Sequence, residues 1–245
     1  MLNHYERKAY EDLMEWKWEL FSKTSLFKKF SKKAQTKING IIPEKVHQVM
    51  TDGIQQMVKM TLFGSDLTTK KPELAYASLQ EKDELVREKL TIYRRTATVE
   101  GAGTGAGGIF LGIADFPLLL SIKIKYLFEV AAIYGFDTKD YSERLFILHV
   151  FQLAFSDDRK KRETFHTLDN WNEKKHEITE MDWRTFQQEY RDYIDLVKLL
   201  QLIPGFGAIV GAYANYNLLD QLGTTAIHAY HLRLFKESPL DYVEE

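Results

Sequence analysis

The chain has 245 residues, of which 44% are hydrophobic and 28% are charged, a composition typical of a folded globular protein rather than a disordered one. Its 33 basic residues nearly balance its 35 acidic ones, so the chain as a whole lacks the positive charge of a nucleic-acid-binding protein. It contains no cysteine, which excludes disulfides and thiolate metal sites. The first 13 residues lack an uninterrupted apolar core, so we expect no signal peptide and a cytoplasmic protein.

The N-terminal part of the chain predicts an amphipathic helical segment over residues 1–40, followed by a helical domain over residues 41–240. Its apolar residues recur at helical spacing from Leu13 through Trp16 and Leu20 to Ala34. Residues 20–40 contain no acidic residue and six lysines: Lys23, Lys28, Lys29, Lys32, Lys33 and Lys37. Lysines four residues apart on a helix repel each other, and anionic lipid would relieve that repulsion. Two interpretations stay open: an interfacial helix that binds an anionic surface through Trp16 and these lysines, or a solvated outer face of a bundle.

The rest of the chain reads as further helices. We expect one after Pro43 that stops near Gly64, a charged one over residues 73–95, one from Lys123 that ends at Gly135, and an amphipathic one over 182–200. Residues 145–155 are apolar on all sides, which indicates a helix buried in the core. The single β-leaning run, residues 91–99, cannot form a sheet alone. The sequence therefore predicts an all-α fold, a single multi-helix bundle of eight to ten helices.

Two glycine-rich segments stand out, because nine of the 14 glycines lie within residues 101–112 and 205–211. Glycines four residues apart let helices approach closely, so we expect helix packing through Gly101, Gly105, Gly108, Gly112, Gly207 and Gly211. Shallow insertion into a membrane and a transmembrane hairpin are the alternatives, since each apolar run reaches about 20 residues. Residues 103–108 also match the dinucleotide fingerprint GxGxxG, but the strand–helix alternation that should accompany it is missing. We therefore expect no nucleotide cofactor.

The same glycine-rich segments carry a resemblance to a known family. Residues 96–120 (TATVEGAGTGAGGIFLGIADFPLLL), 132–137 (AIYGFD), 144–148 (RLFIL) and 203–226 (IPGFGAIVGAYANYNLLDQLGTTA) are similar to signature blocks of the EcsC family. The likeness extends over about residues 5–235. It implies a role beside the ATPase and membrane subunits of an ABC-type exporter, in secretion or membrane homeostasis. It implies no catalytic residues.

The polar residues within the apolar segments offer one candidate catalytic centre. Asp115, His149 and Glu100 could form an acid–base site of an enzyme that acts on a lipid or on a membrane-delivered substrate. The simpler interpretation gives Asp115 a structural role, because it directly precedes Phe116-Pro117 and can cap the helix that restarts there. By the same reasoning, His149 is a buried, hydrogen-bonded histidine.

Metal-binding patterns are present but weak. Two Glu-x-x-His units occur, Glu44 to His47 and Glu173 to His176, and the second lies in a very polar stretch. His228 and His231 are three residues apart, and packing explains them better than a shared metal does. We expect no metal, no cofactor and no nucleic-acid partner. The expected partners are ABC transporter subunits and an anionic membrane surface, with the protein held peripherally on the inner face of the cell membrane.

Overall fold

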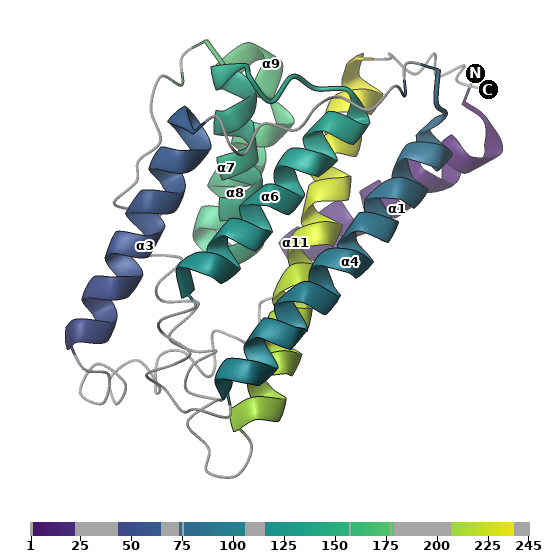
Figure 1. The fold of residues 1–245 in the computed structure, drawn as a ribbon. Helices are drawn as coiled ribbons and strands as arrows, with labels where there is room; N and C mark the ends of the chain where they lie inside the picture. The colour runs from purple at the N-terminus through teal and green to yellow at the C-terminus, as the bar shows by residue number, and fades with distance from the viewer. Residues whose placement is uncertain are drawn as a thin grey trace.

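The computed structural model describes residues 2–22, 44–64, 74, 76–105, 116–156, 158–176, 178 and 207–237. Within these residues the chain forms eight α-helices and no strand, which confirms the predicted all-α class (Figure 1). The helices are α1 (His4–Ser22), α3 (Glu44–Phe63), α4 (Leu79–Gly105), α6 (Phe116–Tyr134), α7 (Tyr141–Phe155), α8 (Asp158–Asp169), α9 (Trp171–Lys174) and α11 (Gly207–Glu237).

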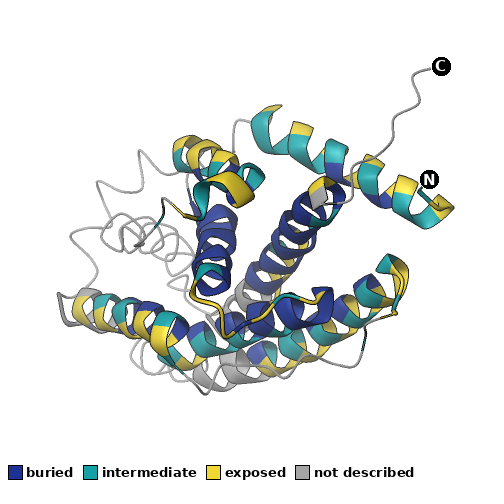
Figure 2. Ribbon diagram, turned by 90° about the horizontal axis from the view of Figure 1, so that it is seen from above, coloured by how far each residue is buried: buried dark blue, intermediate teal, exposed yellow. Residues whose placement is uncertain are grey.

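The long helices α4 and α11 run antiparallel and pack along each other, and α6 lies beside them (Figure 1). Helix α7 is the centre of the core, in contact with α3, α6, α8 and α11. Every residue from Glu143 to Phe155 is buried, as the all-round apolar sequence predicted (Figure 2). At the outer edge, α1 packs on α4, α8 and α11 through Ala9 and Leu13.

The β-leaning run over residues 91–99 lies inside α4, so its local strand preference is overridden. β-Branched residues lower helix propensity only slightly. Here the hydroxyls of Thr91 and Thr96 donate to carbonyls one turn back, at 3.0 and 3.1 Å. Leu90 and Ala97, seven residues apart, are buried. Helix α4 also begins and ends later than the predicted 73–95, and its last residues are the first glycines of the glycine-rich segment.

Helix ends follow the expected chemistry. Helix α3 ends directly before Gly64, and α6 ends at Gly135, which has φ of 100°. The amide of Gly135 donates to Ala132 O and that of Phe136 to Ala131 O, which is the paired arrangement that closes a helix with glycine. Helix α6 starts at Phe116, with Pro117 in its first turn, where proline is well tolerated.

The α4–α11 contact depends on a glycine that the spacing argument did not single out. A Cβ on Gly223 would lie 2.5 Å from Leu90 Cδ2 and 2.9 Å from Leu90 Cδ1, so the Leu90 side chain occupies the space that such a Cβ would need. The glycine-rich ends of the helices, Gly101–Gly105 of α4 and Gly207–Gly211 of α11, lie at the same end of the bundle (Figure 1).

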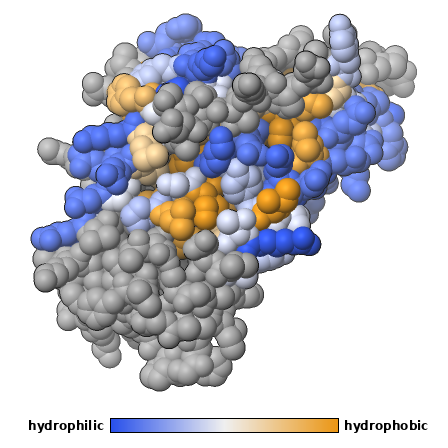
Figure 3. All heavy atoms as spheres, viewed as in Figure 1, coloured by the Kyte–Doolittle hydropathy of each residue, from blue (hydrophilic) through white to orange (hydrophobic). Residues whose placement is uncertain are grey.

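Several predicted features fall outside the described residues. These are the lysines of residues 20–40, Gly108, Gly112, Asp115 and the helix over 182–200. Among the described helices, none is long and apolar enough to cross a membrane. On the face shown in Figure 3, hydrophobic residues lie in patches bounded by hydrophilic ones.

Candidate functional site

A buried carboxylate joins four helices at one end of the bundle. Asp83, in the second turn of α4, is fully buried. Its Oδ1 accepts hydrogen bonds from Tyr134 Oη of α6 at 2.6 Å and from His231 Nε2 of α11 at 2.9 Å. Its Oδ2 accepts one from Tyr5 Oη of α1 at 2.8 Å. Arg87 Nη1 donates to the same Tyr5 hydroxyl at 3.1 Å. We call these five residues the Asp83 cluster.

The Asp83 cluster keeps its carboxylate charged despite burial. Burial alone raises the pKa of Asp83, but the hydrogen bonds and charge of His231 and the hydroxyls of Tyr134 and Tyr5 hold the pKa below its ordinary value. Burial, together with the adjacent Asp83 charge, raises the pKa of Tyr134 well above its ordinary value, so this hydroxyl stays a donor. A buried charge without such partners would cost several kcal/mol.

The Asp83 cluster forms part of the wall of an open cleft of about 1080 Å³. The cleft is lined by α1, by the first turns of α4 and by α11. In Figure 2, α1 is the helix beside the N-terminus label, at the edge of the molecule. Four members of the cluster line the cleft, namely Tyr5, Asp83, Arg87 and His231. The guanidinium of Arg87 is about half-exposed and lies 3.8 Å from Asp83 Oδ2.

A stacked pair continues the cleft wall along α11. The ring of Trp16 stacks on that of His228, with centroids 4.9 Å apart, and His228 lies 6.2 Å from His231 by the same measure. Burial lowers the pKa of His228 to about 4, so this ring is neutral at physiological pH. The Nδ1 atoms of both histidines are buried without a hydrogen-bond partner in the described part of the chain.

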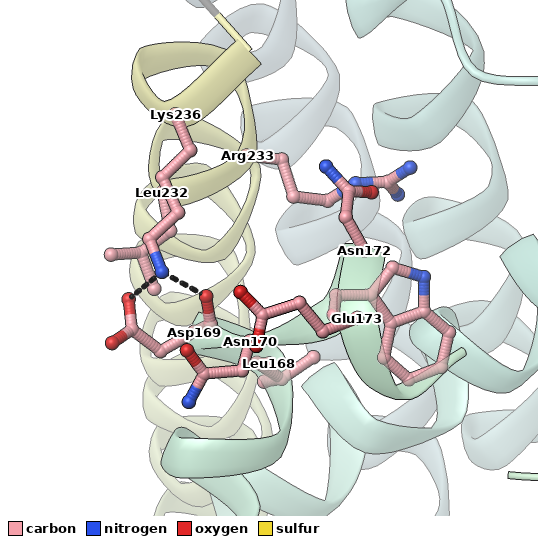
Figure 4. Close-up of a pocket in the computed structure, with 9 residues that line it drawn as sticks. Leu168, Asp169, Asn170, Asn172, Glu173, Leu232, Arg233 and Lys236 are labelled. Carbon is pink, nitrogen blue, oxygen red and sulfur yellow. Dashed lines mark hydrogen bonds and ion pairs between the residues drawn. The ribbon is translucent and has the colours of Figure 1, made fainter. Parts of the chain in front are cut away.

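A second, much smaller pocket of about 50 Å³ lies where α8 and α9 meet the end of α11 (Figure 4). Its cations are held by internal partners: Lys236 Nζ lies 3.2 Å from Asp169 Oδ1 and also donates to the Asp169 carbonyl. Arg233 Nη1 donates to the buried Glu143 carboxylate at 2.6 Å, and its guanidinium stacks 3.7 Å from the Phe136 ring centroid. These pairs hold helices together, so the larger cleft is the better candidate site.

The structure gives His149 the simpler of its two predicted roles. Its Nδ1 lies 2.8 Å from the Leu145 carbonyl one turn back, and its ring packs against the buried Trp171. Burial lowers the pKa of His149 to about 4. Asp115 lies outside the described residues, as does the side chain of Glu100, so the three-residue centre stays a prediction. No group of three or more metal-ligating side chains occurs within the described ranges.

Comparison with known proteins places the chain in a family. The model of the EcsC protein family matches residues 7–235. Protein EcsC of Bacillus subtilis (strain 168) is 54% identical over 228 residues, covering 93% of this chain and 95% of that protein. The chain belongs to the EcsC family. An uncharacterized protein, YdbA, of the same organism is 28% identical over 250 residues, covering 96% of this chain and 92% of the relative. No solved structure matches the EcsC chain.

Asp83 lies in an ordinary charged run of the sequence. Asp83 stands between Lys82 and Glu84, and the sequence reading passed over it. A signal was present, because Asp83 continues the apolar spacing of Leu79, Val86 and Leu90 along α4. A carboxylate in such a row has two explanations. Either the buried face of the helix has been assigned to the wrong residues, or the carboxylate is buried and accepts hydrogen bonds. The donors on α1, α6 and α11 could not be assigned to it from spacing alone.

Proposed function

We propose that this EcsC-family protein is a helical interaction protein that binds peripherally to the inner face of the cell membrane beside an ABC-type exporter. Family membership supports the transporter role, which the EcsC resemblance implies. The observation that carries the membrane part is Trp18, near the C-terminal end of α1. It is 68% exposed and precedes the lysine-rich run of residues 20–40. An exposed indole beside lysines is the composition of an interfacial anchor.

The packing of α1 decides which groups remain for a membrane. Leu13 is buried, and Trp16 stacks on His228 and packs against Phe165. The apolar stripe of α1 is therefore used by the bundle, and Trp16 serves packing. Trp18 is not used in this way and stays exposed. The expected contact is mainly electrostatic, with a single aromatic anchor.

Vesicle co-sedimentation tests the membrane part. We expect binding to vesicles that contain anionic lipid, little binding to neutral ones, and weakening as salt rises, because the Debye length falls from about 10 Å at 0.1 M to about 3 Å at 1 M. Replacing Lys28, Lys29, Lys32 and Lys33 by Glu should abolish binding. Trp18→Ala should weaken it several-fold.

The matched control is Phe63→Ala, which removes an aromatic side chain of similar exposure, 73%, from α3. It should leave vesicle binding unchanged. Equal recovery with neutral and anionic vesicles, or full binding by the quadruple variant, would contradict the proposal.

The alternative function is an enzyme, and one observation favours it. His231 is held at Nε2 by the Asp83 carboxylate and has an unpartnered Nδ1 within the described chain, which is how a carboxylate orients a histidine base. That nitrogen is buried, however, and the cluster's hydrogen bonds already tie four helices together. The interaction role therefore comes first.

A further inference from the structure

The cleft between α1, α4 and α11 contains ionic side chains that the described residues do not neutralise. Lys8, Asp12 and Glu15 are exposed on α1 and line the cleft. None of them forms a hydrogen bond or ion pair with the described residues. Lys8 and Asp12 are four residues apart, a spacing at which opposite charges can pair along a helix. Their separation leaves a cation and two carboxylates free to meet a ligand.

These charges are ordered along the cleft. Lys8 lies toward the start of α1, and the guanidinium of Arg87 is fixed at the same end by its bond to Tyr5. Asp12 and Glu15 follow toward the middle of α1. With a rise of 1.5 Å per residue, they lie about 6 and 10 Å from Lys8 along the helix axis. The end at Lys8 and Arg87 therefore has two cations beside the buried Asp83 carboxylate, and the other end has the carboxylates of Asp12 and Glu15.

The end with Asp12 and Glu15 has features beyond its carboxylates. The indole of Trp16 lines the cleft there, with its ring stacked on that of His228. His228, which also lines the cleft, has a buried Nδ1 that lacks a partner in the described part of the molecule. His231 between the two ends is only 2% exposed, yet its Nδ1 is likewise unpartnered. The two exposed carboxylates suit an ammonium group, which has several N–H donors.

From this arrangement we propose that the cleft binds a small zwitterion, with its phosphate or carboxylate at Lys8 and Arg87 and its primary ammonium at Asp12 and Glu15. This is the chemistry of an ethanolamine phosphate, whether free or as the headgroup of a phospholipid. The proposal is independent of the lysine-rich segment. It assigns to the cleft a ligand that carries both charges, rather than a simple cation or anion.

Calorimetric titration of the full chain with O-phosphoethanolamine is the direct test. We expect saturable binding, and binding at least about tenfold weaker for phosphocholine, whose ammonium has no N–H donor. Ethanolamine alone and inorganic phosphate alone should each bind at least about tenfold more weakly too. Equal affinity for ethanolamine alone would overturn the zwitterion and leave only a cation site. Absence of binding to O-phosphoethanolamine at millimolar concentration would overturn the proposal as a whole.

Variants locate the binding. The double variant Asp12→Asn/Glu15→Gln should bind O-phosphoethanolamine about tenfold more weakly than the parent, and so should the single variant Lys8→Gln. The melting temperatures of both variants should match that of the parent. The matched controls are Glu11→Gln and Arg7→Gln, which change exposed charges on α1 outside the cleft. Controls that lose as much affinity as the cleft variants would contradict the assignment.

Vesicle flotation in high salt separates the two sources of the ligand. Neutral phosphatidylcholine vesicles are compared with and without phosphatidylethanolamine, so that the lysine-rich segment contributes little. Recovery that depends on phosphatidylethanolamine and on Asp12 and Glu15 supports the lipid headgroup. Binding of free O-phosphoethanolamine without vesicle recovery supports a soluble zwitterion. Failure of both arms, with anionic vesicles still bound at low salt, would overturn the cleft site and leave the proposed membrane function standing.

Discussion

Asp83 contributes its charge to folding because donors from three other helices surround it. Its pKa is lower in the folded state than in the unfolded chain. Its stabilising contribution is therefore complete above the unfolded pKa of about 4 and is lost as pH falls through the folded value. Asp83→Asn should cost about 3 kcal/mol of unfolding free energy at pH 7. The difference from the parent should shrink as pH falls from 6 to 3.

Denaturant unfolding at several pH values measures this difference. Glu88→Gln, which changes an exposed carboxylate on the same helix, is the control and should cost less than about 0.5 kcal/mol throughout. A gap between the parent and Asp83→Asn that stays constant with pH would show that the Asp83 charge is not what the cluster stabilises.

The pKa values of His149 and His228 are lower than that of a surface histidine. Burial lowers the pKa of each to about 4, below the unfolded value of about 6.5. Between these values only the unfolded chain takes up the proton, so both residues destabilise the fold as pH falls through that window. Nitrogen chemical shifts of the imidazole rings should show no titration of either residue from pH 8 to 5. A midpoint near 6.5 for His149 would reopen the acid–base role suggested by the sequence.

For single residues, the sequence predicted the structural role correctly where that role depends on one helix alone. Gly135 ends α6 as predicted, because only local backbone geometry is involved. His149 is buried because its whole helix is apolar. The partners of Asp83 lie 51, 78 and 148 residues away along the chain. No local sequence pattern predicts contacts between residues so far apart in the chain.

Among the elements, the α4–α11 interface contains a glycine, Gly223, whose missing side chain leaves room for a residue of the other helix. Leu90 of α4 fills the space that a Cβ on Gly223 would need. Gly223→Ala should therefore cost about 1–3 kcal/mol, since Leu90 is buried and has little room to move. Combined with Leu90→Ala, the same substitution should cost much less than alone. Thermal or denaturant unfolding of the four proteins of this cycle gives the coupling, and additive costs would show that the two residues do not compete for space.

Helix α4 also marks the limit of local propensity. The β-leaning run 91–99 continues a helix because tertiary burial along α11 outweighs the small preferences of threonine and tyrosine. Gly101–Gly105 and Gly207–Gly211 lie at one end of the bundle. The contact between the two glycine segments themselves remains a prediction.

On the scale of the whole molecule, we propose two different regions as contacts for partners. One is the lysine-rich run that follows α1, beside the exposed Trp18. The other is the open cleft with unpaired charges on α1. Both involve α1, whose inner face is fixed to the bundle by Leu13, Trp16 and Tyr5. This arrangement makes α1 the element through which the molecule would meet a membrane and a transporter.

Partner identification in cells tests the proposed function most directly. The tagged chain is crosslinked in living cells and purified from the membrane fraction, and the attached proteins are identified by mass spectrometry. We predict enrichment of the ATPase or membrane subunits of an ABC-type exporter, with strong reduction for the variant in which Lys28, Lys29, Lys32 and Lys33 are Glu. Recovery of the chain away from membranes without transporter subunits, or identical partners for parent and variant, would contradict the account.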